Sequence, residues 1–262
     1  MGFNCGIVGL PNVGKSTLFN ALTSGSADAS NYPFCTIDPN IGIVPIPDLR
    51  LDELVEIYRP AKRVPSVIEF VDIAGLVRGA SGGEGLGNQF LSRIRDVDAI
   101  AHVVRCFDDP NIVHVDGSLD PRRDIEVVEA ELIFKDLETI ERKLSEAQKR
   151  AKAGDKKSRL EAEFHARVRD HLMGGRLVRY FPFHFPDEAL WLQECHLLTN
   201  KPVMYVCNVH EKDVAAGNVY SRIVHEVAAR EGARVVSVSA AVESEVAELR
   251  EGRGRHFSRD WG

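Results

Sequence analysis

The stretch GLPNVGKST, residues 9–17, constrains this chain more than any other, because it spells the pattern G-x-x-x-x-G-K-[ST]. The apolar run at residues 4–8 precedes it, and residues 15–22 follow with the spacing of an amphipathic helix. Glycines at Gly9 and Gly14 let backbone N–H groups turn toward an anion, and the N-terminus of the helix adds partial positive charge. The pattern therefore predicts a strand, a phosphate-binding loop and a helix at the start of an α/β fold.

The side chains of this loop have roles that follow from their chemistry. The Lys15 ammonium can reach the β and γ phosphates of a nucleotide, so we expect it to serve catalysis as well as binding. The Ser16 hydroxyl is a ligand for Mg²⁺ in this pattern, which predicts Mg²⁺ as a cofactor. The nucleotide-binding residues expected from the loop are Asn12, Val13, Gly14, Lys15, Ser16 and Thr17.

Apolar segments alternate with helical ones along most of the chain. A helix is expected at residues 51–58, and strands are expected at residues 41–46, 67–72, 98–104, 202–207 and 233–238. This alternation favours a mostly parallel sheet covered on both faces, as in a P-loop NTPase.

One segment, residues 121–173, breaks the alternation, since glycine is nearly absent from it. Apolar residues there recur at alternating spacings of four and three, as in a coiled coil, and after a turn at Gly154 a second set recurs at every fourth position. We predict an inserted antiparallel helical hairpin. The first seam is Ile133, Leu137, Ile140, Leu144 and Ala147, and the second is Leu160, Phe164, Val168 and Leu172. The expected domains are residues 1–119 and 187–249 for nucleotide binding, 120–186 for the insertion and 250–262 for an atypical tail.

Charge is unevenly distributed along the sequence. The whole chain has a formal net charge of −6, which argues against general affinity for nucleic acids, and we expect no DNA partner. Residues 142–179, however, hold twelve Lys or Arg and five Asp or Glu. Such a basic segment is either a solvated helix face or a surface that meets RNA phosphate.

The sequence indicates neither a membrane span nor a secretion signal. No apolar stretch approaches the roughly 20 residues that cross a bilayer, and the N-terminus lacks a basic region. We therefore expect a cytoplasmic location and no membrane partner. The five cysteines lie far apart without His neighbours at ligand spacing, so we expect reduced thiols and no zinc site.

The segment that starts at Asp72 predicts the handling of the metal and the γ-phosphate. Asp72 ends an apolar strand and begins the pattern D-x-x-G, which finishes at Gly75. In this position a carboxylate can hold Mg²⁺ through water while the glycine N–H meets the γ-phosphate. Thr36, in the loop between the two motifs, is the candidate for a second hydroxyl on Mg²⁺ that senses this phosphate; a plain loop threonine is the alternative. The expected metal ligands are thus Ser16, Thr36 and Asp72.

The residue after Gly75 determines what can position the attacking water. Many nucleotide switches have a glutamine there, whereas this chain has Leu76, whose side chain neither donates nor accepts a hydrogen bond. Hydrolysis must therefore be slow or use another group. His114, in the loop after the strand at residues 98–104, is the candidate proton carrier, and an exposed loop histidine without a role is the alternative.

Base choice is predicted by residues 208–211, NVHE, which stand where GTP-binding proteins have N-K-x-D. That aspartate accepts two hydrogen bonds from guanine, and the lysine stem covers the ring. Val209 removes the stem, and Glu211 places its carboxylate one methylene further out. Losing such a hydrogen-bond pair costs a few kcal/mol, so ATP is expected over GTP.

Together these motifs resemble the Obg-like ATPases of the YchF group, within the Obg-related P-loop translation factors. The resemblance is carried by His114, the helical insertion, and residues 9–17, 31–40, 72–91 and 208–211. It implies slow Mg²⁺-dependent ATP hydrolysis that uses His114, association with ribosomes or ribosomal RNA, and a K⁺ ion held with help from Asn12. It also implies a base-contacting loop at Ser239 and Ala240, beside Asn208, Val209 and Glu211.

The sequence departs from that family after residue 249. Members continue into a β-rich TGS domain, whereas the Arg- and Gly-rich tail here resembles a truncation or a shifted reading frame. Ribosome binding is then in question, but nucleotide binding is expected to survive. Two alternative functions stay open, a GTPase of the Obg type and an ATP sensor that does not hydrolyse.

Overall fold

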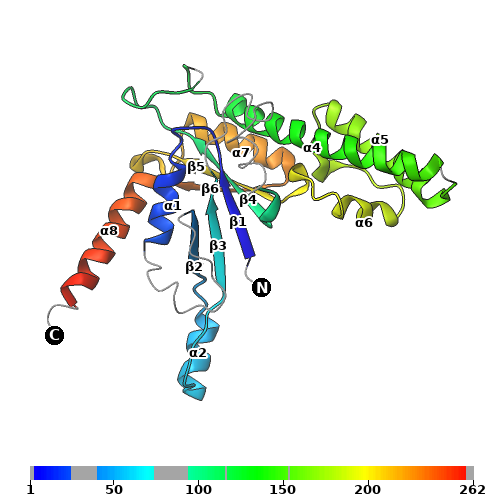
Figure 1. The fold of residues 1–262 in the computed structure, drawn as a ribbon. Helices are drawn as coiled ribbons and strands as arrows, with labels where there is room; N and C mark the ends of the chain where they lie inside the picture. The colour runs from blue at the N-terminus through cyan, green and yellow to red at the C-terminus, as the bar shows by residue number, and fades with distance from the viewer. Residues whose placement is uncertain (1–2, 25–39, 74–93, 116, 153, 258–262) are drawn as a thin grey trace.

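The computed structural model describes residues 3–24, 40–73, 94–115, 117–152 and 154–257, with side chains up to residue 249. Within this part of the chain lies a six-stranded sheet in the order β2-β3-β1-β4-β5-β6 (Figure 1). β2 is antiparallel to β3, and the other neighbours are parallel, which confirms the expected P-loop NTPase fold. The strands are β1 (Phe3–Val8), β2 (Ile41–Pro45), β3 (Val67–Asp72), β4 (Ala99–Arg105), β5 (Val203–Asn208) and β6 (Arg234–Val238).

The helices at residues 15–23, 49–58, 121–152 and 156–173 lie where the sequence predicts them, whereas the helices at residues 187–193, 219–231 and 240–257 were not predicted. The strand ends differ from the expected ones by a single residue at most. Among the helices of the described residues, none is both long and apolar enough for a membrane crossing. The helices are α1 (Lys15–Thr23), α2 (Leu49–Tyr58), α4 (Pro121–Lys152), α5 (Lys156–Met173), α6 (Asp187–Gln193), α7 (Val219–Glu231) and α8 (Ala240–Phe257), and the short 3₁₀ turns are η3 (Val178–Tyr180), η4 (Leu198–Asn200) and η5 (Glu211–Asp213).

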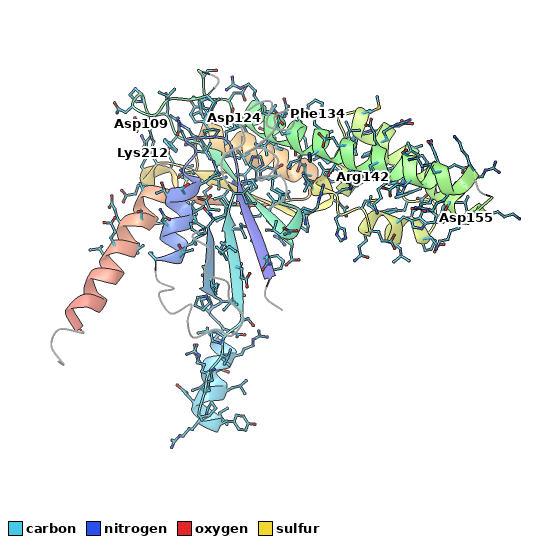
Figure 2. The ribbon with its side chains drawn as sticks, in the orientation of Figure 1. Asp109, Asp124, Phe134, Arg142, Asp155 and Lys212 are labelled. Atoms are coloured by element: carbon cyan, nitrogen blue, oxygen red, sulfur yellow. The ribbon has the colours of Figure 1, made fainter. Side chains whose placement is uncertain are left out.

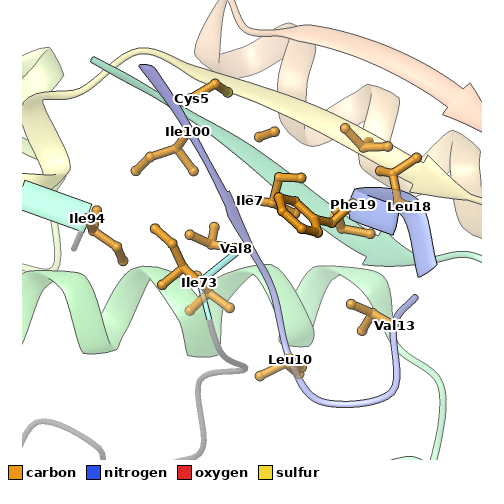
Figure 3. Packing of buried hydrophobic residues seen from close by; sticks show 14 of the residues in the cluster. Cys5, Ile7, Val8, Leu10, Val13, Leu18, Phe19, Ile73, Ile94 and Ile100 are labelled. Carbon is orange, nitrogen blue, oxygen red and sulfur yellow. The ribbon is translucent and has the colours of Figure 1, made fainter. Parts of the chain in front are cut away.

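The main apolar core holds the phosphate-binding loop in place. Ile7 and Val8 on the central strand β1 are fully buried, and Phe19 of α1 belongs to the same cluster (Figure 3). Leu10 and Val13 of the loop itself are also buried in this cluster. Because close-packed side chains move little, the packing of Leu10 and Val13 in the core holds the loop backbone in place.

The insertion between β4 and β5 is the expected helical hairpin, in which α4 and α5 run side by side away from the sheet (Figure 1). Nearly all seam residues are buried, but Leu160 is 48% exposed, so its assignment to the seam was wrong. A spacing of exactly four advances about 40° around a helix at each step, which turns Leu160 away from the face that Val168 and Leu172 share. The hairpin core also includes Trp191 and Cys195. The expected boundary at residue 186 stays a prediction.

A buried carboxylate ties the hairpin to the sheet. Asp136 of α4 is fully buried and accepts hydrogen bonds from the N–H groups of Leu198 and Thr199 at 2.7 and 2.8 Å. The Thr199 hydroxyl donates a third bond at 2.7 Å. Burial raises the pKa of Asp136 to about 6 even though the hydrogen bonds oppose this shift. Since η4 leads directly into β5, this contact connects the hairpin to a strand that ends at the functional site.

Candidate functional site

The backbone of the phosphate-binding loop has the conformation that its glycines predict. Gly9 has a φ of +151°, and a Cβ there would lie 2.4 Å from the carbonyl oxygen of Val103. Gly14 has a φ of +95° and precedes α1 without any side-chain hydrogen bond capping the helix. The first N–H groups of α1 thus lack a side-chain acceptor within the described residues. A helix start of this kind is an anion-binding site.

Lys15 lies at this helix start and is buried, with 6% of its surface exposed. Its Nζ donates a hydrogen bond of 2.7 Å to the carbonyl oxygen of Leu10, within the same loop. Burial lowers its pKa to about 8, and the nearby Asp72 carboxylate partly offsets that effect. An ammonium that is poorly solvated gains more from a phosphate partner than an exposed one does.

The predicted metal ligands Ser16 and Asp72 lie together although 56 positions separate them. Register pairs Asp72 with Ile7, so parallel pairing of β3 with β1 brings the carboxylate beside the loop. The Ser16 hydroxyl donates to Asp72 Oδ2 at 3.0 Å, while Oδ1 is buried and has no hydrogen-bond partner in the described part of the chain. A hydroxyl beside a carboxylate with a spare oxygen fits a hard cation such as Mg²⁺.

Three residues of the sequence argument, Thr36, Gly75 and Leu76, lie outside the described residues. Their roles stay predictions.

The loop after β4 passes beside the phosphate-binding loop and is fixed at two points. The buried guanidinium of Arg105 donates to the carbonyl oxygens of Phe107, Asp109 and Ile112 at 3.0, 3.2 and 3.0 Å. Asn12 Nδ2 donates to the carbonyl oxygen of Val113 at 3.2 Å. The backbone of the following residue, His114, is therefore held next to the phosphate-binding loop. Its role in catalysis is not tested by this placement.

A cavity of about 460 Å³ opens at the ends of β4 and β5. Its walls contain seven of the predicted nucleotide-binding or ion-binding residues, but Glu211 is exposed at the start of η5 and is not among them. The lining residues are Asn12, Gly14, Thr17, Phe107, Asp109, Ile112, Asn208, Val209, His210, Ser239, Ala240 and Ala241.

Asn208 holds two walls of this cavity together. Its Nδ2 donates to the carbonyl oxygen of Val13 at 2.9 Å, and its Oδ1 accepts from the N–H of Ala240 at 3.0 Å. The end of β5 therefore connects the phosphate-binding loop to the start of α8. Val209, only 2% exposed, supplies an apolar wall beside it.

Two aromatic walls, Phe107 and His210, were missed by the sequence argument. Their rings contact each other at a centroid distance of 5.4 Å. Their position in the sequence could have identified them, because each residue follows the carboxyl end of a central strand by two residues. Ligands of open α/β sheets bind at these strand ends.

Comparison with known proteins shows the family of this chain. A family profile described as a 50S ribosome-binding GTPase matches residues 4–154. The ribosome-binding ATPase YchF of Haemophilus influenzae is 52% identical over 262 residues, which cover 100% of this chain and 72% of that protein. The protein of the same name from Bacillus subtilis is 51% identical over 251 residues, covering 95% of this chain and 68% of that protein. This chain belongs to the YchF family.

A solved YchF structure supports the assignment at the level of the fold. The YchF GTPase of Schizosaccharomyces pombe superposes with a TM-score of 0.80 at 37% identity, covering 99% of this chain and 71% of that one. The resemblance to the YchF group inferred from the sequence is thus confirmed. The YchF relatives are named for ATP hydrolysis and the solved structure for GTP hydrolysis, so these names agree on nucleotide hydrolysis and differ on the base.

Proposed function

We propose that this chain is a switch that binds ATP with Mg²⁺, hydrolyses it slowly and acts on the ribosome in the cytoplasm. The observation that carries the proposal is the meeting of Ser16 with Asp72 beside the uncapped start of α1. Lys15 stands at the same place as the cation for the β and γ phosphates.

Ser16 and Asp72 would hold the magnesium ion, and we propose Thr36 as a further ligand. The ion would neutralise charge on the phosphates as it develops during transfer. Asp72 Oδ1, buried without a partner in the described residues, supports this assignment, because a bare carboxylate oxygen in a buried site is unfavourable until a cation or donor meets it. Thr36 and Gly75 would respond to the γ-phosphate, so their loops order before hydrolysis and relax afterwards.

Slow turnover follows from the side chain at position 76. Leucine cannot orient water, so His114 is proposed as the group that takes the water proton. The support is the anchoring of its loop to Asn12. Asn12 is also proposed to help hold K⁺, and turnover measured with K⁺ and with Na⁺ tests that part separately.

Adenine is the proposed base because the cavity beside Asn208 has apolar and aromatic walls and, among its described lining residues next to Val209, no acidic side chain of the kind that selects guanine. Val209, Phe107 and His210 present apolar and aromatic surface, which suits any purine ring. Guanine selection needs an acidic side chain that accepts from two guanine donors at once, and Glu211 is exposed outside the lining. A GTPase remains the second candidate, since the family profile and the solved YchF structure are both described as GTPases.

The ribosome is the proposed partner because the curated relatives are named ribosome-binding. The hairpin supports this, since its Lys and Arg residues form a basic segment that RNA phosphates attract. Binding of purified ribosomes should weaken steeply as salt rises from 50 to 200 mM, by about tenfold or more for a few phosphate contacts. Binding that does not change with salt would contradict the assignment to the hairpin.

Nucleotide titration of the purified chain tests the base. We expect ATP to bind at least tenfold more tightly than GTP, and tighter GTP binding would overturn the argument from Glu211 and Val209.

Single-turnover hydrolysis tests the enzyme activity. The unaltered chain should release phosphate from ATP faster than the Lys15→Ala variant does. This variant removes the ammonium group and leaves the proposed metal ligands Ser16 and Asp72 unchanged. Release no higher than the Lys15→Ala background, with ATP still bound by the unaltered chain, would leave the ATP sensor as the function.

A further inference from the structure

The inserted helix α4 contacts the loop after β4 through its first turns. Asp120 accepts hydrogen bonds from the N–H groups of Arg122 and Arg123, and Pro121 follows Asp120 as the first helical residue. This arrangement fixes the start of α4 and with it Asp124, which is 3% exposed. Figure 2 shows Asp124 at the end of α4 that lies over the sheet, while Asp155 marks the distant tip of the hairpin.

The carboxylate of Asp124 contacts the imidazole of His114. Oδ2 lies 2.9 Å from His114 Nε2, and both side chains are nearly buried, with 4% and 9% exposed. The other carboxylate oxygen, Oδ1, is 3.4 Å from the Arg123 guanidinium. The histidine thus belongs to the loop beside the phosphate-binding loop, and the carboxylate that faces it belongs to the insertion.

A carboxylate in this position determines the state of the ring. It accepts a hydrogen bond from the Nε2–H group, so the lone pair of a neutral imidazole lies on Nδ1. It also restricts rotation of the ring. These effects are those required for a histidine that receives a proton during a reaction.

We propose that Asp124 is the positioning residue for His114 in ATP hydrolysis, so that the inserted hairpin supplies part of the catalytic arrangement. This inference rests on the proposed ATPase function. As water oxygen bonds to the γ-phosphorus, the bond from that phosphorus to the β–γ bridging oxygen breaks and ADP leaves. One water proton passes to His114 at Nδ1 and then to solvent, while Asp124 keeps its charge and holds Nε2.

The test is Asp124→Asn, which preserves size and removes the charge. We expect kcat to fall about tenfold to hundredfold with the KM for ATP unchanged, because the altered group acts on proton transfer and not on binding. Glu126→Gln is the matched control, since it removes one carboxylate charge from the same part of α4 at an exposed side chain. Its kcat should stay within about twofold of the unaltered chain.

A double variant separates positioning from general structural damage. If Asp124 acts through His114, Asp124→Asn should slow His114→Ala no further, whereas independent effects would multiply. Wild-type kcat in Asp124→Asn, or multiplying effects in the double variant, would overturn the proposal. If the unaltered chain and His114→Ala both fail to release phosphate, the proposed ATPase function itself fails, which is a different result.

A measurement on the unaltered protein covers the case in which Asp124→Asn does not fold. Nitrogen-15 NMR of the histidine rings distinguishes the two neutral tautomers. We expect His114 to carry its proton on Nε2 with ADP bound. A proton found mainly on Nδ1 would overturn the proposal.

Discussion

Replacing Asp136 with alanine tests how firmly the hairpin is attached to the sheet. The substitution removes an acceptor that serves the N–H groups of Leu198 and Thr199, at 2.7 and 2.8 Å. Each buried N–H left without a partner costs about 1–3 kcal/mol. Relief from burying a carboxylate offsets part of this loss. We therefore expect Asp136→Ala to lower the free energy of unfolding by about 2–4 kcal/mol at neutral pH.

The loss should also depend on pH with a definite sign. Burial raises the pKa of the Asp136 carboxyl from 3.8 to about 6, so the folded chain binds more protons than the unfolded chain between these values. The contribution of this carboxyl to stability is then full below pH 4 and falls as pH rises through 6. From pH 5 to pH 7.5 the cost of Asp136→Ala should shrink by about 1 kcal/mol.

Urea unfolding followed by circular dichroism at these two pH values measures both quantities. Glu138→Ala is the control on the same helix, because Glu138 is exposed and its ion pair with Lys135 lies at the surface. Its cost should stay below about 1 kcal/mol. A cost of Asp136→Ala below that of the control, or one that grows as pH rises, would refute the reasoning.

Three further predictions concern the nucleotide cavity and the base of the hairpin. Gly14→Ala should weaken ATP binding at least tenfold, as measured by calorimetry, because φ at this position is +95° and the new Cβ would lie 2.3 Å from Asn208 Nδ2. Unchanged affinity would mean that the loop adopts another conformation at no cost. Asn208→Ala should weaken ATP binding by about tenfold to hundredfold, since it removes the hydrogen bonds that connect Val13 to Ala240. An equal loss of affinity for inorganic phosphate would show that the effect does not arise where the base binds. Burial, and secondly the nearby Glu231 carboxylate, raises the pKa of Glu129 to about 7, so its contribution to stability falls as pH rises through 7. Glu129→Gln should remove this pH dependence of the free energy of unfolding. The measurement is urea unfolding of both proteins at pH 5 and pH 8, and an equal difference in stability at the two pH values would contradict the prediction.

Several features of the fold and the site could be predicted from local sequence. The phosphate-binding loop is one, because the φ of Gly14 and the start of α1 at Lys15 depend on a few consecutive residues. The strands and the hairpin seam are others, since the central strands are continuous apolar runs and the seam repeats with a helical period. Leu160 shows the limit of such periods, because its spacing fitted while its exact angle around α5 did not.

The sequence by itself thus determined that an anion-binding loop begins the chain, and family membership followed from the same motifs. The motifs also led us to expect Ser16 and Asp72 close together, and parallel pairing of β3 with β1 is what brings them there. Only the tertiary structure decided the contacts that no motif encodes, since the packing of α4 over the sheet brings Asp124 to His114. The reason is physical: backbone geometry is set by neighbours in sequence, whereas contacts across the sheet are set by the packing of the whole core.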